Sequence, residues 1–203
     1  MALLHWEKVT WRDFVAGLKG YREQFPRAFS AAEVFPDDAA GIIALLNRWA
    51  CRLSVERAPS ALDRWIREHH PLDELEPLTI SDPGLPFDEL GALHDGLIAH
   101  MQAGGVPNMG PAAASKALYL LQPSLFVMWD REISRSAPEG YGSYLLQMHS
   151  LAVRLSDEAP TDEIEAYLQQ LLGYSDRKTL AKYLDEFNWF EAVGREQLAS
   201  GDP

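Results

Sequence analysis

The spacing of apolar residues is the feature that most constrains the fold of this chain. Apolar side chains recur at helical intervals along most of the sequence, and the strict alternation that is typical of strands is nearly absent. The pattern is strongest over 39–53, 87–101, 141–155, 162–172 and 176–190. It predicts an all-α protein of about eight helices, each burying one broad apolar face.

Start signals add two helices to this set. Thr10-Trp11-Arg12-Asp13 is similar to a capping box, with Asp in place of the usual Glu or Gln, and predicts a helix that begins at Trp11. Ser60 precedes Leu62, Trp65 and Ile66, so we expect it to cap a short helix.

The domain organisation follows from one irregular segment. Residues 71–86 contain four prolines and one glycine, which predicts an irregular connection between two helical parts. Neither part alone has a complete core. We therefore expect one two-lobed unit over residues 1–203, with a cleft between the lobes.

Composition excludes several classes of protein. The chain has 203 residues, of which 47% are hydrophobic and six are Trp, so it is not a disordered chain. Cys51 is the only cysteine, which excludes a disulfide framework and a four-Cys zinc or iron–sulfur site within one chain. The His residues show no pair at i, i+4 spacing. We expect no metal site and no cofactor.

Charge and hydropathy bear on location and partners. The beginning of the chain lacks a basic stretch and an apolar run, and no 18 consecutive residues are apolar, so we expect a cytoplasmic protein without a membrane span. The formal net charge is −12. This balance counts against a membrane surface and against nucleic acid, because phosphate binding is normally driven by Lys and Arg.

The most informative stretch begins with a glycine-bearing connection over 104–110. Asn108 can adopt a left-handed conformation, and Gly110 can take a positive φ and has no Cβ to block the approach of another backbone. Pro111 is suited to the first position of the helix that continues over 112–121. The beginning of that helix offers free amides and a positive dipole end, which can hold a phosphate without a lysine.

A carboxylate follows the next apolar segment. Residues 124–129 are apolar, and we expect them to be extended. Asp130 then stands at the N-cap position of another helix, which begins with Arg131. Such a carboxylate is held rigidly and faces the space between the lobes, or it only caps the helix.

We expect residues 87–136 to form a helix-hairpin-helix and the segment with Asp130. Within them, about 30 residues over 104–136 resemble the helix-hairpin-helix (HhH-GPD) superfamily of DNA glycosylases, which includes endonuclease III, adenine glycosylases and 8-oxoguanine glycosylases. The hairpin Val106-Pro107-Asn108-Met109-Gly110 has the layout of the family's Leu-Pro-Gly-Val-Gly hairpin. Ala113 and Ala114 occupy the family's small Thr-Ala pair. Asp130 follows Gly110 by twenty residues, as the catalytic Asp of the family usually does, and Ile133 and Arg135 match the pattern that follows it.

The resemblance implies a DNA N-glycosylase of base-excision repair that flips a damaged base of duplex DNA into the cleft. A backbone phosphate of the DNA would lie against the hairpin, at Val106, Asn108, Met109, Gly110 and Ala112. Asp130 would be the catalytic carboxylate that supports departure of the base.

The chain departs from the family pattern in three ways. Bifunctional members have a nucleophilic Lys at the position of Ala112, and the family has Gly at the position of Asn108. The four-Cys iron–sulfur loop of some members is absent.

Lys116 could replace the nucleophilic Lys that is missing at Ala112. It lies one helical turn after Ala112 on nearly the same face, and it is the only Lys or Arg between Glu68 and Asp130. If it faces the pocket, desolvation would make its amine nucleophilic, and a Schiff base with abasic-site lyase activity would follow. The alternative is a solvated helix lysine.

Two other readings stay open for the whole chain. One is a non-catalytic helical module of the same fold that binds nucleic acid or a protein, which Ala112 and the acidic balance favour. The other is an unrelated helical protein whose hairpin matches by chance. Whatever the function, we expect Phe126, Met128 and Trp129 to be core residues rather than a platform for stacking bases.

The distribution of positive charge along the chain weakens the argument that the negative net charge excludes nucleic acid. Arg131 and Arg135 follow Asp130, and Arg177, Lys178 and Lys182 share one late predicted helix. The hairpin binds through backbone amides, so the acidic balance does not exclude DNA. It does predict weak non-specific binding that fades quickly with salt.

Overall fold

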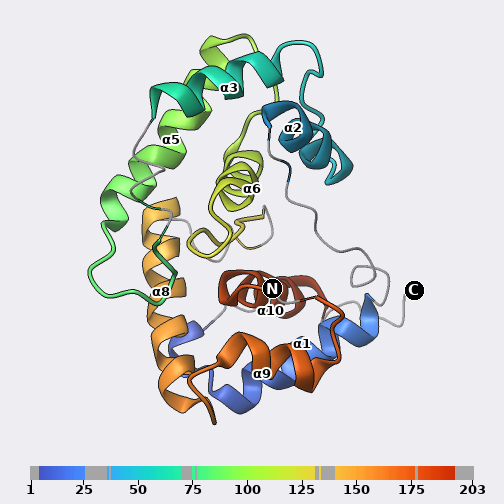
Figure 1. Ribbon diagram of the computed structural model, residues 1–203, viewed down its shortest axis with the longest axis vertical. Helices are drawn as coiled ribbons and strands as arrows, with labels where there is room; N and C mark the ends of the chain where they lie inside the picture. The colour runs from blue at the N-terminus through green and yellow to red at the C-terminus, as the bar shows by residue number, and fades with distance from the viewer. Residues whose placement is uncertain are drawn as a thin grey trace.

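The fold is all-α, as Figure 1 shows for the computed structural model of the chain. The structure describes residues 5–25, 36, 38–69, 75, 77–130, 133, 140–176 and 178–194. Those residues form eight α-helices and no strand, which confirms the predicted class. The helices are α1 (Trp11–Gln24), α2 (Ala39–Arg48), α3 (Ala58–Glu68), α5 (Phe87–Ala103), α6 (Pro111–Leu121), α8 (Tyr141–Glu158), α9 (Ile164–Leu172) and α10 (Leu180–Trp189), with a 3-10 turn η1 (Trp6–Lys8) and a π-helical turn η3 (Phe190–Gly194).

The helix starts follow local side-chain chemistry. Thr10 and Asp13 form the predicted capping box at the start of α1. The start predicted at Ser60 is wrong, because α3 begins at Ala58 with Pro59 in its first turn. The hydroxyl of Ser60 lies inside this helix and donates to the carbonyl of Arg57.

Helix α2 ends earlier than the apolar pattern predicts. It stops at Arg48 rather than near Leu53, because Ala50 and Arg52 adopt left-handed conformations with φ of 62° and 56°. The side chain of Asn47 stabilises this turn by bonding to both the N–H and the carbonyl of Leu53. The apolar residues after Arg48 therefore belong to a loop.

The helices pack in two sets that share α8. Helices α2, α3, α5 and α6 contact one another in one set, and α1, α9, α10 and η3 form the other. The long helix α8 contacts α5 in the first set and α10 in the second, and Figure 1 shows it running along one side of both. Gly91 of α5 and Gly142 of α8 lie in close contact, which lets these two helices approach each other.

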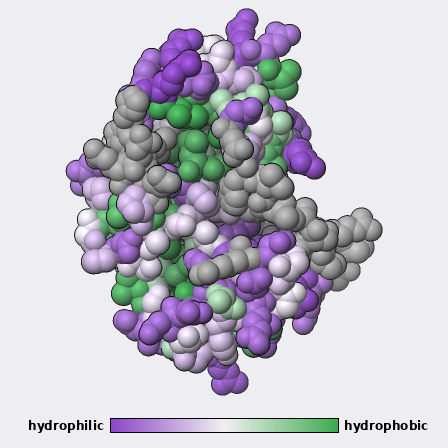
Figure 2. Space-filling view, viewed as in Figure 1, coloured by the Kyte–Doolittle hydropathy of each residue, from purple (hydrophilic) through white to green (hydrophobic). Residues whose placement is uncertain are grey.

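The outer surface is mainly polar on the face that Figure 2 shows. Hydrophilic residues cover its upper and lower ends, and hydrophobic residues gather in smaller patches between them. None of the helices in the described ranges combines the length and the apolar character needed to traverse a membrane.

Candidate functional site

The segment that follows α6 carries Asp130. The extended conformation expected over 124–129 is wrong at its start, because residues 123–125 form a turn in which the N–H groups of Leu125 and Phe126 donate to the carbonyl of Gln122. Residues 125–129 are buried, and the described residues include no strand that could satisfy their backbone groups. The N–H of Trp129 donates to Oγ of Ser115, at 2.9 Å. Ser115 is fully buried in α6 and donates its own hydrogen to the carbonyl of Ala112. The position of Asp130 is thereby tied to the first turns of α6.

Two tyrosines of α8 hold the same segment from the other side. The hydroxyl of Tyr141 donates to the carbonyl of Val127 at 2.9 Å, and that of Tyr144 donates to the carbonyl of Met128 at 3.0 Å. Both rings are buried. The apolar residues before Asp130 are buried, as the sequence predicts. Their backbone also receives three hydrogen bonds from the side chains of Ser115, Tyr141 and Tyr144, which the sequence does not predict.

Lys116 and Asp130 form an ion pair. Nζ of Lys116 lies 2.8 Å from Oδ1 of Asp130, and the side chains are 13% and 27% exposed. The alternative of a solvated helix lysine is therefore wrong. The N-cap role considered for Asp130 depends on residues 131–132 and 134–139, which lie outside the described residues.

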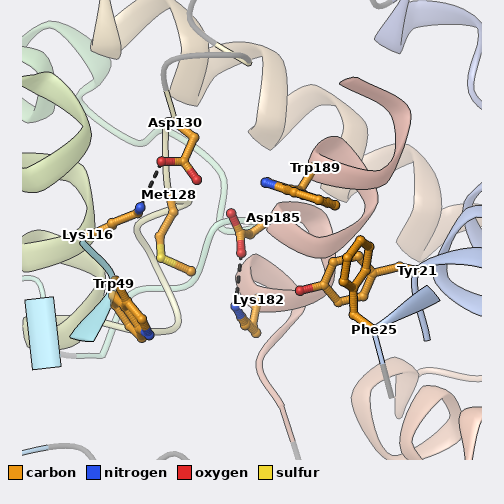
Figure 3. A pocket seen from close by; sticks show the side chains of 9 residues that line it. All are labelled: Tyr21, Phe25, Trp49, Lys116, Met128, Asp130, Lys182, Asp185 and Trp189. Carbon is orange, nitrogen blue, oxygen red and sulfur yellow. Dashed lines mark hydrogen bonds and ion pairs between the residues drawn. The ribbon is translucent and has the colours of Figure 1, made fainter. Parts of the chain in front are cut away.

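The ion pair borders two pockets. We call the first the aromatic pocket: it has a volume of about 250 Å³ and is lined by Tyr21, Phe25, Trp49, Lys116, Met128, Asp130, Lys182, Asp185 and Trp189 (Figure 3). We call the second the hairpin pocket: it has a volume of about 430 Å³ and is lined by Trp49, Ala50, Cys51, Asn108, Gly110, Pro111, Ala112, Ala113, Lys116, Trp129 and Asp130. Trp49, Lys116 and Asp130 line both, so the pair lies where the pockets meet.

The beginning of α6 opens into the hairpin pocket. Gly110 is the N-cap residue and no side chain caps the helix, so the N–H groups of Ala112 and Ala113 have no partner within the first turn. Asn108 has the expected left-handed φ of 68°, whereas Gly110 has a φ of −109° and not the positive value considered for it. A Cβ at Gly110 would meet open space, so another molecule has room to approach there.

The hairpin residues differ in what they offer a ligand. The side chains of Val106 and Met109 are buried, with 1% exposure each, and the N–H of Val106 is bonded to the carbonyl of Met101. The N–H of Gly110 donates to the carbonyl of Asn108. Among the five predicted phosphate-binding residues, the structure therefore places only Asn108, Gly110 and Ala112 against the hairpin pocket.

Asp185 is a site residue that sequence reasoning missed. It lies on α10 and lines the aromatic pocket, where Nζ of Lys182 approaches Oδ2 at 3.0 Å. Burial raises the pKa of the Asp185 carboxyl to about 6, while Lys182 opposes this shift and Asp130 adds to it. The signal in the sequence was an i, i+3 Lys–Asp pair on a helix, which usually indicates a surface ion pair.

Lys178 and Lys182, which were predicted to share one late helix, are both paired with acidic side chains, and only Lys182 lies on α10. Lys182 is paired with Asp185, and Lys178, which precedes α10, contacts the buried carboxylate of Glu186 at 2.5 Å. The ammonium of Lys178 also lies 4.1 Å from the centre of the Tyr174 ring. Arg131, Arg135 and Arg177 lie outside the described residues.

Aromatic side chains form one wall of the aromatic pocket. Phe25 and Trp189 meet edge to face with ring centres 4.7 Å apart, and Tyr21 lies 5.3 Å from Phe25 and 6.0 Å from Trp189. Figure 3 shows this group on the opposite side of the pocket from Lys116 and Asp130. A planar ring would find stacking partners there.

Cys51 lines the hairpin pocket beside the ion pair. It is partly buried, and desolvation raises the pKa of its thiol. A thiol with a raised pKa is mostly protonated near neutral pH and is a poor nucleophile. Within the described residues, no three His, Cys, Asp or Glu side chains come together as ligands for a metal ion.

No protein family, curated protein or solved structure with which the chain was compared matches it.

Proposed function

We propose that this chain is a DNA N-glycosylase of the helix-hairpin-helix type, which releases a damaged base from duplex DNA. The observation that carries the proposal is the Lys116–Asp130 pair at the junction of two pockets, one lined by the hairpin and the other by aromatic rings. The sequence resemblance places a catalytic carboxylate at Asp130, and this carboxylate borders both pockets. The two sets of helices would be the two lobes, and the aromatic pocket would belong to the cleft between them.

The chemistry requires a fixed anion beside the sugar. When the glycosidic bond breaks, positive charge develops on C1′ of the deoxyribose, and a nearby carboxylate lowers the energy of that state. Asp130 meets this need because hydrogen bonds from Ser115, Tyr141 and Tyr144 immobilise the segment before it. Little reorganisation is then required when the charge appears.

Lys116 has two roles open to it in this proposal. As an ammonium, it orients Asp130 through their ion pair. As a neutral amine, after its proton has passed to Asp130, it would attack C1′ and displace the base, which leaves with the electron pair of the glycosidic bond. Opening of the C1′–O4′ bond, with O4′ taking a proton, would then give the Schiff base that leads to strand cleavage.

The phosphate of the flipped nucleotide would lie at the beginning of α6. The uncapped amides of Ala112 and Ala113 and the dipole of α6 attract an anion, and Gly110 leaves room for it. Lys178 and Lys182 are paired with acidic side chains, so they add little to this contact, and we expect weak binding to undamaged DNA.

A second candidate is a non-catalytic module of the same fold that binds DNA or a protein. The bond between the Gly110 N–H and the Asn108 carbonyl favours it, because that amide is already occupied. The pairing of Lys116 with Asp130 favours it too, because each charge is satisfied without a substrate.

Base release from defined duplexes tests the proposal. The protein is incubated with duplexes that carry uracil, 8-oxoguanine, an alkylated base or an abasic site, and free base and strand cleavage are measured. We expect release that disappears in Asp130→Asn and persists in Asp63→Asn, which makes the same change of charge in the exposed pair with Arg67 on α3. Salt-sensitive binding without release on any duplex would favour the non-catalytic module. If the protein neither releases a base nor binds any duplex, the glycosylase and a DNA-binding module are both contradicted.

A further inference from the structure

Two carboxyl groups from different parts of the chain face the aromatic pocket. Asp130 enters from the segment after α6, and Asp185 enters from α10 (Figure 3). Each forms an ion pair with a lysine, at 2.8 Å from Lys116 and at 3.0 Å from Lys182. The surroundings differ, because the Asp130 side chain is 27% exposed and that of Asp185 is 9% exposed.

The surroundings of Asp185 favour its protonated form. Burial is the largest cause and raises its pKa to about 6, and the negative charges of Asp130 and Glu186 act in the same direction. Lys182 opposes them. The other titratable groups that face this region are Lys116 on α6, Tyr21 on α1, and Tyr141 and Tyr144 on α8. Burial, and to a lesser extent the charge of Asp185, raise the pKa values of Tyr141 and Tyr144 well above the ordinary value.

Carboxyl groups in unlike surroundings within one pocket are suited to opposite tasks in acid–base catalysis. We propose that Asp185 donates a proton to the departing base while Asp130 acts as the carboxylate beside the sugar. The inference rests on the proposed glycosylase function and deepens it. It gives the reaction an acid, a role that the sequence resemblance did not assign to any residue of this chain.

The step balances as follows. The bond between C1′ and the base nitrogen breaks, and its electron pair goes to the base. A ring nitrogen of the base takes the proton of Asp185. The oxygen of a water molecule bonds to C1′, and a proton of that water goes to Asp130. One proton has then left Asp185 and one has reached Asp130, and exchange with solvent restores both.

The proposal defines a substrate class. A neutral base is a poor leaving group and gains from protonation as it departs, whereas a base that alkylation has already made cationic leaves as a neutral molecule without a proton. Asp185 therefore matters for neutral bases. Asp130 matters for both kinds, because charge develops on the sugar in either case.

The difference between neutral and cationic bases is tested by measuring base release from two duplexes under single-turnover conditions. One duplex carries hypoxanthine, which is neutral, and the other carries 7-methylguanine, which is cationic. We expect Asp185→Asn to slow hypoxanthine release by on the order of a hundredfold and to leave 7-methylguanine release nearly unchanged. Asp130→Asn slows both, and Asp63→Asn slows neither.

The other outcomes separate this inference from the proposed function. Three outcomes overturn the proton-donor role only. Asp185→Asn could slow release from both duplexes equally, it could slow release from neither, or the native protein could release the cationic base alone. If only hypoxanthine is released, its rate must fall as the pH rises through about 6, and Asp185→Asn must remove that dependence. Release of no base from any duplex overturns the glycosylase function and this inference together.

Direct titration gives a readout besides activity. In protein with ¹³C-labelled aspartate, the Asp185 carboxyl should titrate near pH 6, and Asp130→Asn should lower its pKa because a neighbouring negative charge is gone. An ordinary carboxyl pKa at Asp185 would overturn the proposal whatever the activity. If Asp185→Asn does not fold, Lys182→Gln takes its place and should move the fall of the hypoxanthine rate to higher pH, because Lys182 lowers the pKa of Asp185.

Discussion

Lys116 and Asp130 form an ion pair of 2.8 Å at the meeting point of two pockets, although Lys116 lies on α6 and Asp130 lies on the segment after it. Each side chain is the partner of the other in the described structure. The pair is only partly exposed, so removing one charge leaves the other in surroundings that solvate it poorly. Substitution of either residue is therefore expected to alter the remaining one, and a variant that keeps the charge is needed as a control.

Substitution of Lys116 tests the Schiff-base route. Treatment with borohydride in the presence of a damaged duplex should trap a covalent complex, and Lys116→Ala should abolish it because the amine is gone. Lys116→Arg serves as the control, since it keeps a positive charge beside Asp130 but cannot form a Schiff base. We expect base release to survive better in Lys116→Arg than in Lys116→Ala. A complex that persists in Lys116→Ala would show that another amine is the nucleophile.

The raised pKa of Asp185 predicts a specific pH dependence of stability. The folded protein holds the Asp185 proton up to about pH 6, whereas the unfolded chain releases it near the ordinary value of 3.8. The folded state therefore binds the proton more tightly. The stability that comes from this proton is fully present below about pH 4 and is lost as the pH rises through about 6, a change on the order of 3 kcal/mol.

Chemical denaturation of the native protein and Asp185→Asn from pH 4 to pH 7 measures this change. Carboxylates that do not interact with Asp185 contribute equally to both proteins and cancel in the difference. The free energy of unfolding of the native protein should fall relative to that of Asp185→Asn as the pH rises. A difference that stays constant across this range would contradict a raised pKa.

We expect removal of the Tyr144 hydroxyl to lower both the stability of the protein and the rate of base release. Tyr144→Phe leaves the carbonyl of Met128 without its donor in a buried place, which should cost about 1 to 3 kcal/mol. It should also lower the rate of base release more than the affinity for the duplex, because it loosens the segment that holds Asp130. Ser150→Ala on the same helix is the control, because its exposed hydroxyl bonds only to the preceding turn, at Leu146, and the change should be within about 0.5 kcal/mol of neutral. Equal stability of the two variants would argue against this role of Tyr144.

The contact between α5 and α8 gives a prediction that is independent of function. A Cβ at Gly142 would lie 2.6 Å from the backbone carbonyl oxygen of Phe87, so Gly142→Ala must push the two helices apart. We expect a loss of about 1 to 3 kcal/mol in thermal or urea unfolding. Gly96→Ala on α5 meets nothing within 4 Å and should instead stabilise the protein by up to about 1 kcal/mol. Two variants of equal stability would mean that the helices adjust freely.

The helix boundaries show how far local chemistry carries a prediction. Thr10 and Asp13 are close in the chain, and the capping box that they form could be predicted from spacing alone. The end of α2 could not, because it depends on two left-handed residues and on the side chain of Asn47 reaching back to Leu53. The apolar pattern continues through Ala50 and Leu53 whether or not the helix does.

The sequence by itself determined the all-α class, the hairpin with Asn108 in a left-handed conformation, and the candidates Lys116 and Asp130. These depend on residues within one or two helical turns, or on a spacing within one segment. Only the tertiary structure decided that Lys116 faces Asp130, that α8 supplies hydrogen bonds to the segment between them, and that Asp185 enters the same pocket from α10. The reason is physical: burial and the pairing of distant charges are set by how helices pack, and no short stretch of sequence records which helices will meet.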